Sequence, residues 1–167
     1  YFDETGERNL KSVSVIPCRH AEVDENNVCI GCGRTRVVSV GYGGVSELFD
    51  SFDDAIRCAE KNDGSVVRLY QDVTLDSGSA LSGDGCISFE KGIYTIDLGG
   101  KTLTLTGSDI TGAVISSGCN LTFTDTVGGG KVKSGVGHEN LCVRAGGRLT
   151  VTGGDFGAVR AGKEDRG

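Results

Sequence analysis

From Ser65 onward the chain is a series of short runs in which apolar and polar residues alternate, separated by glycine turns. In the run TLTLT at 102–106 the leucines face one way and the threonines the other, as in a half-buried strand. Glycines at 99–100, 128–130 and 146–147 mark turns. Strands are predicted over 66–70, 73–75, 86–89, 93–98, 101–106, 113–117, 120–124, 131–134, 141–145, 148–152 and 158–161.

Two of these stretches repeat each other. AVISSGCNLTFT (113–124) matches LCVRAGGRLTVT (141–152) position for position, with Gly118 over Gly146. A short repeat of this kind cannot bury its inner face alone, and stacking successive repeats buries it. The alignment predicts that Val114 lies beside Cys142.

The spacing of the repeats predicts the fold class. Leu121 lies 18 residues after Leu103 and 28 residues before Leu149, so a unit of 18 to 28 residues is expected, with Leu121 beside Leu149. The predicted fold is mainly β, a right-handed parallel β-helix, which is a solenoid. An antiparallel sandwich is the alternative that the same strands permit.

One helix is predicted at 52–62, before the strands. Ser51 and Asp54 form an S-x-x-D capping box, and Gly64 can close the other end. Its single apolar stripe consists of Phe52, Ala55, Ile56 and Ala59. We expect this helix to cap the N-terminal end of the β-helix, because an open end exposes strand edges and core.

Four potential metal ligands precede the helix. They are Cys18, His20, Cys29 and Cys32. Three thiolates and one imidazole can close the tetrahedral shell of a structural zinc site and leave no position for water. We therefore predict a zinc knuckle in which Zn²⁺ is structural and not catalytic. The other cysteines are expected to fill the core, with a disulfide as the alternative, and are Cys58, Cys86, Cys119 and Cys142.

These elements divide the chain into three segments: the zinc-knuckle segment at 1–46, the capping helix at 47–64 and the β-helix coils at 65–167. Two strand-like runs flank the knuckle, at 13–16 and 37–40, and are predicted to pair with each other. We expect the chain to be an excerpt of a longer polypeptide, since it has no signal segment and stops after few coils.

Composition narrows the possible partners. A net charge of −6 and a pI near 4.9 argue against nucleic acid, which requires a basic face. No run approaches the roughly 18 apolar residues needed to cross a bilayer, so no membrane insertion is expected within this fragment. With 28 glycines and one proline, the chain indicates many turns between strands and not a disordered linker.

Catalytic motifs are weak throughout. Gly99-Gly100-Lys101-Thr102 resembles the end of a phosphate-binding loop, but position 95 is Thr and a strand follows where a helix is required. His138 lies in the loop GVGHENL and has no triad to join. The candidate residues for a polysaccharide lyase or hydrolase are Asp97, Asp125, Asp155, Lys131 and Arg144. The aspartates follow strands at turns, where Asp bonds to backbone N–H groups, so no catalytic residue is predicted.

Several stretches together resemble a known kind of protein. SFDDAIRCAEKNDGSVVRLYQDVTL, IYTIDLGGKTLTLTG and NLTFTDTVGGGKV, preceded by C-x-H…C-x-x-C, are similar to the N-terminal region of large surface proteins of Gram-positive gut bacteria. The β-helix region of those proteins resembles the pectin-lyase fold. The resemblance implies a secreted or cell-surface bacterial protein.

The resulting functional expectation is a non-enzymatic, adhesin-like binding module. Its partner would be a host protein, such as an immunoglobulin (a superantigen-like activity) or a mucin, or a polysaccharide. Exposed rows at 102/104/106, 120/122/124 and 150/152, which are threonines except for Asn120, are the candidate binding surface. The alternative is the N-terminal segment of a carbohydrate-active β-helix enzyme whose catalytic coils lie beyond Gly167.

Overall fold

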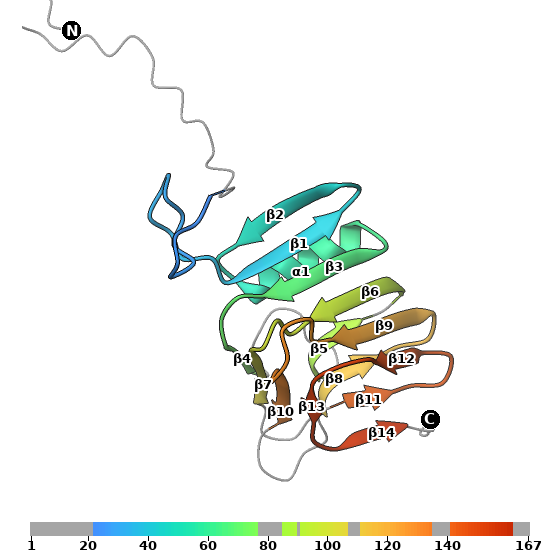
Figure 1. The fold of residues 1–167 in the computed structure, drawn as a ribbon. Coiled ribbons are helices and arrows are strands. Elements are labelled where there is room, and N and C mark those ends of the chain that lie inside the picture. The colour runs from blue at the N-terminus through green and yellow to red at the C-terminus, as the bar shows by residue number, and fades with distance from the viewer. Residues whose placement is uncertain (1–21, 77–84, 90, 107–110, 135–140, 162–167) are drawn as a thin grey trace, which may run out of the picture.

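The computed structural model describes residues 22–76, 85–89, 91–106, 111–134 and 141–161 (Figure 1). As predicted, these residues are mainly β with a single helix. Their elements are β1 Val38–Tyr42, β2 Val45–Phe49, α1 Phe52–Lys61, β3 Ser65–Leu69, β4 Val73–Asp76, β5 Gly85–Phe89, β6 Gly92–Asp97, β7 Thr102–Thr106, β8 Thr111–Ile115, β9 Cys119–Thr124, β10 Lys131–Ser134, β11 Leu141–Val143, β12 Arg148–Val151, β13 Asp155–Phe156 and β14 Val159–Ala161.

The strands form three sheets that the chain visits in turn. One sheet has the order β12-β9-β6-β3-β1-β2, the second β13-β10-β7-β4 and the third β14-β11-β8-β5. Every described pair among β3 to β14 is parallel, so these strands do not form the antiparallel sandwich considered as the alternative. Each passage through the three sheets therefore adds one strand to each (Figure 1).

The aligned repeat is confirmed at the level of register. Cys142 pairs with Val114, and Leu149 pairs with Leu121. The backbone N–H of Gly118 donates to the carbonyl of Gly146 at 2.9 Å, so the two turn glycines also stack. This register could be predicted from the sequence because the two predicted strands and the turn between them have the same lengths in both repeats.

The prediction that the run at Leu103 lines up with the run at Leu121, 18 residues later, is wrong. Leu103 belongs to the second sheet, where it pairs with Val73 and Val132, whereas Leu121 belongs to the first and pairs with Tyr94. Alternation of Leu and Thr marks any half-buried strand and does not say which sheet the strand enters. The runs at 102–106 and 120–124 therefore share an alternating pattern but belong to different sheets.

The core lies between the three sheets and is built from columns of stacked side chains. In the first sheet Val67 pairs with Ile96 and Ile96 with Phe123, and all three side chains are fully buried. The ring of Phe123 meets that of Phe156 from the second sheet edge to face, with centroids 5.2 Å apart. Such columns make each strand's burial depend on its neighbours in the stack.

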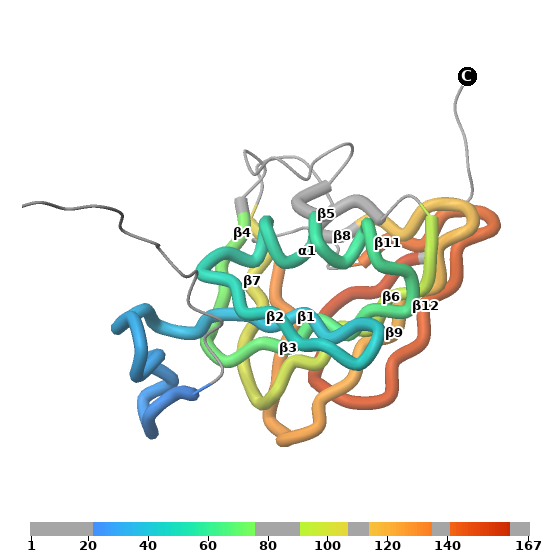
Figure 2. Tube along the Cα trace, turned by 90° about the horizontal axis from the view of Figure 1, so that it is seen from above, coloured from blue at the N-terminus to red at the C-terminus, as the bar shows by residue number. Residues whose placement is uncertain are grey.

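The predicted helix is present, and Ser51 caps it. Ser51 Oγ accepts a hydrogen bond from the Asp54 N–H at 3.4 Å. The apolar stripe is buried and packs on β1, β2 and β3 at the N-terminal end of the stack (Figures 1 and 2). The C-cap is Asn62 and not Gly64, whose N–H donates instead to the Ile93 carbonyl at 2.9 Å.

The strand β1 does not have the partner predicted for it. Its two edges pair antiparallel with β2 and β3, so no edge is left for residues 13–16, which lie outside the described residues. The sequence analysis missed β2, although Gly43-Gly44 is a turn signal. Both glycines have positive φ, 53° and 81°, as a two-residue hairpin turn requires. The strand β2 spans the boundary predicted between residues 46 and 47.

The cysteines expected in the core lie at different depths. Cys119 is fully buried, whereas Cys58 and Cys142 are half-buried. These three thiols are not joined in disulfides. The side chain of Cys86 lies outside the region that the structure describes. Within that region, no helix has the length and apolar character to cross a membrane.

Candidate functional site

The C-x-x-C half of the predicted zinc site forms a tight hairpin. Val28 and Thr35 make an antiparallel bridge, and inside it the Cys29 N–H donates to the Arg34 carbonyl at 2.7 Å. The Gly33 N–H then donates back to the Cys29 carbonyl at 2.8 Å. Gly33 has φ +72°, a left-handed conformation that suits glycine. Cys29 is buried and Cys32 is exposed, both on this one turn.

A second turn precedes the hairpin and braces it. Asp24 Oδ1 accepts from the N–H groups of Asn26 and Val28, at 2.8 and 2.9 Å. The Ile30 N–H donates to the Glu22 carbonyl at 3.1 Å. Backbone bonds therefore hold the segment that carries both thiols, although it buries few apolar side chains.

The described part of this segment contains two of the four predicted zinc ligands, Cys29 and Cys32. Two thiols on one tight turn are the arrangement that structural zinc sites use for a pair of ligands. Cys18 and His20, the other predicted ligands, lie outside the described residues. Among the residues that are described, no group of three or more His, Cys, Asp or Glu side chains is placed to hold a metal ion.

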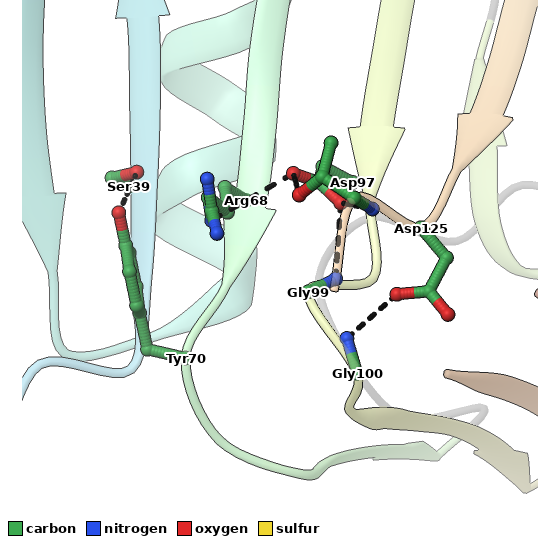
Figure 3. Close-up of polar contacts among 8 residues, drawn as sticks. Ser39, Arg68, Tyr70, Asp97, Gly99, Gly100 and Asp125 are labelled. Atoms are coloured by element: carbon green, nitrogen blue, oxygen red, sulfur yellow. Dashed lines mark hydrogen bonds and ion pairs between the residues drawn. The ribbon is translucent and has the colours of Figure 1, made fainter. Parts of the chain in front are cut away.

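Asp97 is buried and bonds to two successive turns of the chain. Its Oδ1 accepts from the Gly99 N–H at 3.0 Å within its own turn, and from the Thr126 N–H at 3.0 Å in the next one. Its Oδ2 accepts from the Thr126 hydroxyl at 2.7 Å. The predicted turn role of Asp97 is thus confirmed, and these bonds leave its carboxylate little capacity for a substrate (Figure 3).

Asp125 has the same role in the following turn. Its Oδ1 accepts from the Gly100 N–H and its Oδ2 from the Gly130 N–H, both at 2.7 Å. Desolvation raises the pKa of the Asp125 carboxyl, but hydrogen bonds from backbone N–H groups outweigh it, so the pKa is lowered overall. A carboxyl with a lowered pKa is a poor general acid at neutral pH.

Two of the other candidates for polysaccharide chemistry, Lys131 and Asp155, line a pocket together with Asp125. Lys131 and Asp155 pair in register on β10 and β13, and both are exposed. Arg144 is half-buried in the turn after β11, where its N–H donates to the Ile115 carbonyl at 2.9 Å. His138 lies outside the described residues.

A thiol beside a tyrosine and a carboxylate lies between α1 and the β1–β2 hairpin. The Tyr42 hydroxyl donates to Glu47, and this bond, burial and the charge of Glu47 raise the pKa of Tyr42 to about 12. Burial, followed by the charge of Glu47, raises the pKa of the Cys58 thiol. Since the thiolate is the nucleophile, Cys58 is poorly suited to covalent catalysis.

The outer face of the six-stranded sheet carries a row of threonines, but not the rows predicted. Thr95, Thr122 and Thr150 pair in register across β6, β9 and β12. Thr104, which was expected in the same surface, lies in the second sheet beside Thr74 and Lys133. The row on the first sheet continues to the exposed side chain of Val66 on β3.

Next to this row lies a cluster of Arg36, Arg68 and Tyr70 that sequence analysis missed. The guanidinium carbon of Arg36 is 3.4 Å from the centroid of the Tyr70 ring, and that of Arg68 is 5.7 Å away. The Ser39 hydroxyl donates to the Tyr70 hydroxyl at 3.4 Å (Figure 3). Antiparallel pairing of β1 with β3 brings these residues together, and no local motif signals it.

No family model matches the chain, and no curated protein or solved structure matches it either. The site is therefore interpreted from its own geometry.

Proposed function

We propose that this chain is a non-enzymatic binding module of a bacterial surface protein, built as a right-handed parallel β-helix. The three sheets that the chain visits in turn support the β-helix, because such an order is what successive coils produce. The helix α1 acts as its N-terminal cap. Its partner is a host protein or a glycan, with an immunoglobulin among the candidate proteins.

The observation that carries the binding function is the outer face of the six-stranded sheet. It is a broad strand surface with hydroxyl groups in register at Thr95, Thr122 and Thr150, and with exposed apolar side chains at Val66 and Ile93. Mixed apolar and hydroxyl surfaces of this kind suit macromolecular recognition. The carboxylates of Asp97 and Asp125 are bonded to backbone N–H groups, which favours binding over catalysis.

A binding assay tests this function. The chain is immobilised and exposed by surface plasmon resonance to purified immunoglobulin G, mucin and a panel of neutral and acidic polysaccharides. Thr122→Glu places a charge in the middle of the threonine row and is expected to weaken binding at least about tenfold. Thr104→Glu is the matched control on the second sheet. Equal loss in both variants, or cleavage of a polysaccharide without stable binding, contradicts the proposal.

We also propose that Zn²⁺ stabilises the segment before β1, with Cys18, His20, Cys29 and Cys32 as ligands. The tight turn that carries Cys29 and Cys32 supports this, since it places two thiols within a few residues. The expected result is one zinc per chain by elemental analysis, lost in Cys32→Ser and retained in Cys142→Ser. Retention of the metal in Cys32→Ser, or its absence from chain purified under reducing conditions with added zinc, contradicts the proposal.

A further inference from the structure

Two arginines on the outer face share one aromatic ring. Tyr70 follows β3, and its N–H donates to the Val37 carbonyl at 2.9 Å, which places the ring beside the start of β1. Arg36 and Arg68 both lie within the distance at which a cation is attracted to the face of the ring. Both guanidinium groups are therefore anchored at this one ring.

The charges of this pair are incompletely balanced. Asp97 Oδ2 lies 3.7 Å from Arg68 Nε, which is within ion-pair distance but too long for a hydrogen bond. The same carboxylate already accepts bonds from Gly99 and Thr126. Arg36 has no carboxylate within ion-pair distance among the described residues. In a chain of net charge −6, this is a local excess of positive charge.

One hydrogen-bond donor of each arginine is also unpaired. The Nε atoms of Arg36 and Arg68 are buried without an acceptor in the described region of the chain. The Arg68 side chain is nevertheless 39% exposed, so other atoms of it reach solvent. A guanidinium offers five N–H donors in a planar fork, which matches the two oxygens of a carboxylate.

We propose that Arg36 and Arg68 together bind a carboxylate presented by an acidic segment of a partner protein. This inference rests on the proposed binding function and specifies its partner. Charge complementarity selects an anion, and the fork geometry favours a planar carboxylate. An arginine–tyrosine cluster with the exposed side chain of Val66 two residues from Arg68 on β3 has the composition of a protein interface core.

The position of Arg36 favours a protein over a sugar as the source of the carboxylate. Sugar rings are held by stacking on an open aromatic face, and Arg36 already covers the Tyr70 ring at 3.4 Å. On the neighbouring strands, Asp97 of β6 contacts Arg68, and Ser39 of β1 donates to the Tyr70 hydroxyl. The partner is therefore expected to contribute acidic side chains and apolar contacts and not a stacked pyranose.

The test uses the whole chain and three probes, measured by isothermal titration calorimetry at low and high salt. The probes are a hexaglutamate peptide, a hexalysine peptide and polygalacturonate, whose carboxylates are carried by sugar. We expect saturable binding of hexaglutamate that weakens with salt, and no binding of hexalysine. Arg36→Gln should weaken hexaglutamate binding about tenfold or more, because a charge-assisted bond is lost.

Arg148→Gln on β12 is the matched control, since Arg148 is exposed on the same sheet and distant in strand order from β1 and β3. Unfolding by urea checks that each variant folds, and Arg36→Gln leaves the Arg68–Asp97 pair in place. Equal binding by the two variants, binding of polygalacturonate alone, or no binding of hexaglutamate overturns the inference. If immunoglobulin or mucin still binds and Arg36→Gln leaves that binding unchanged, the anion site fails while the binding function stands.

Discussion

At the scale of single residues, Asp97 and Asp125 each join one turn of the chain to the next. Asp97 bonds forward to Thr126, and Asp125 bonds back to Gly100. Both carboxylates therefore substitute for backbone acceptors that the glycine turns lack. This use explains why these two aspartates directly follow strands.

The lowered pKa of Asp125 makes its contribution to stability depend on pH. Its ordinary value is 3.8, and the folded value lies below it, so the contribution is complete above 3.8 and is lost as pH falls through the folded value. Asp125→Asn should lower the free energy of unfolding by about 1–2 kcal/mol at pH 7, through loss of charge-assisted hydrogen bonds. Urea unfolding at pH 7 and pH 3 should show the difference from wild type narrowing at the lower pH.

The exposed Asp155 supplies the control for this measurement. Asp155→Asn should change the free energy of unfolding by less than about 0.5 kcal/mol at either pH. A difference between Asp125→Asn and wild type that stays constant from pH 7 to pH 3 would show that the ionised form of Asp125 is not what bonds to the glycine N–H groups.

At the scale of elements, some turns pack against neighbouring strands and others project into solvent. Gly99 has φ +57°, and a Cβ there would lie 2.6 Å from the carbonyl oxygen of Leu69 in the adjacent layer. Gly43 has nearly the same φ, +53°, but a Cβ there would meet nothing within 4 Å. The two glycines share a backbone conformation and differ in surroundings.

Comparing alanine substitutions at Gly43 and Gly99 separates the cost of backbone strain from the cost of a steric clash. Gly43→Ala should cost about 1 kcal/mol of the free energy of unfolding, from the left-handed backbone alone. Gly99→Ala should cost about 1–3 kcal/mol more, since a backbone oxygen cannot move aside as a flexible side chain does. Chemical denaturation of both variants measures the difference. Equal costs would mean that the turn at Gly99 shifts freely away from Leu69.

At the scale of the whole molecule, burial changes along the stack. Leu121 and Phe123 on β9 are fully buried between β6 and β12. On β12, at the edge of the sheet, Leu149 is half-buried and Val151 is 45% exposed. Stability in a stack of similar layers comes from contacts between neighbours, so edge layers are held by fewer of them.

Hydrogen exchange should therefore be uneven along the stack. Amides of β6 and β9 are expected to exchange at least about tenfold more slowly than those of β12 and β14, because edge layers open without global unfolding. Exchange followed by mass spectrometry on peptides from these strands measures this. A uniform rate across β6, β9, β12 and β14 would instead indicate that the molecule opens as one unit.

Most of the local structure of this protein, though not β2, β13 or the C-cap of α1, was determined by its sequence alone. Alternation of apolar and polar residues located the strands from β3 to β12, the capping serine located α1, and matched spacing set the register of Leu121 against Leu149. The turn role of Asp97 was also predictable, since an Asp before glycines bonds to nearby backbone. These features depend on side-chain direction and on contacts within a few residues.

Only the tertiary structure decided which strands share a sheet and which distant side chains meet. It placed Leu103 away from Leu121, filled both edges of β1 and brought Arg36 and Arg68 to Tyr70. The physical reason is that apolar–polar alternation with a period of two residues specifies which face of a strand is buried, but not which strand lies next to it. The neighbour depends on the length of chain between turns and on the packing of the whole stack.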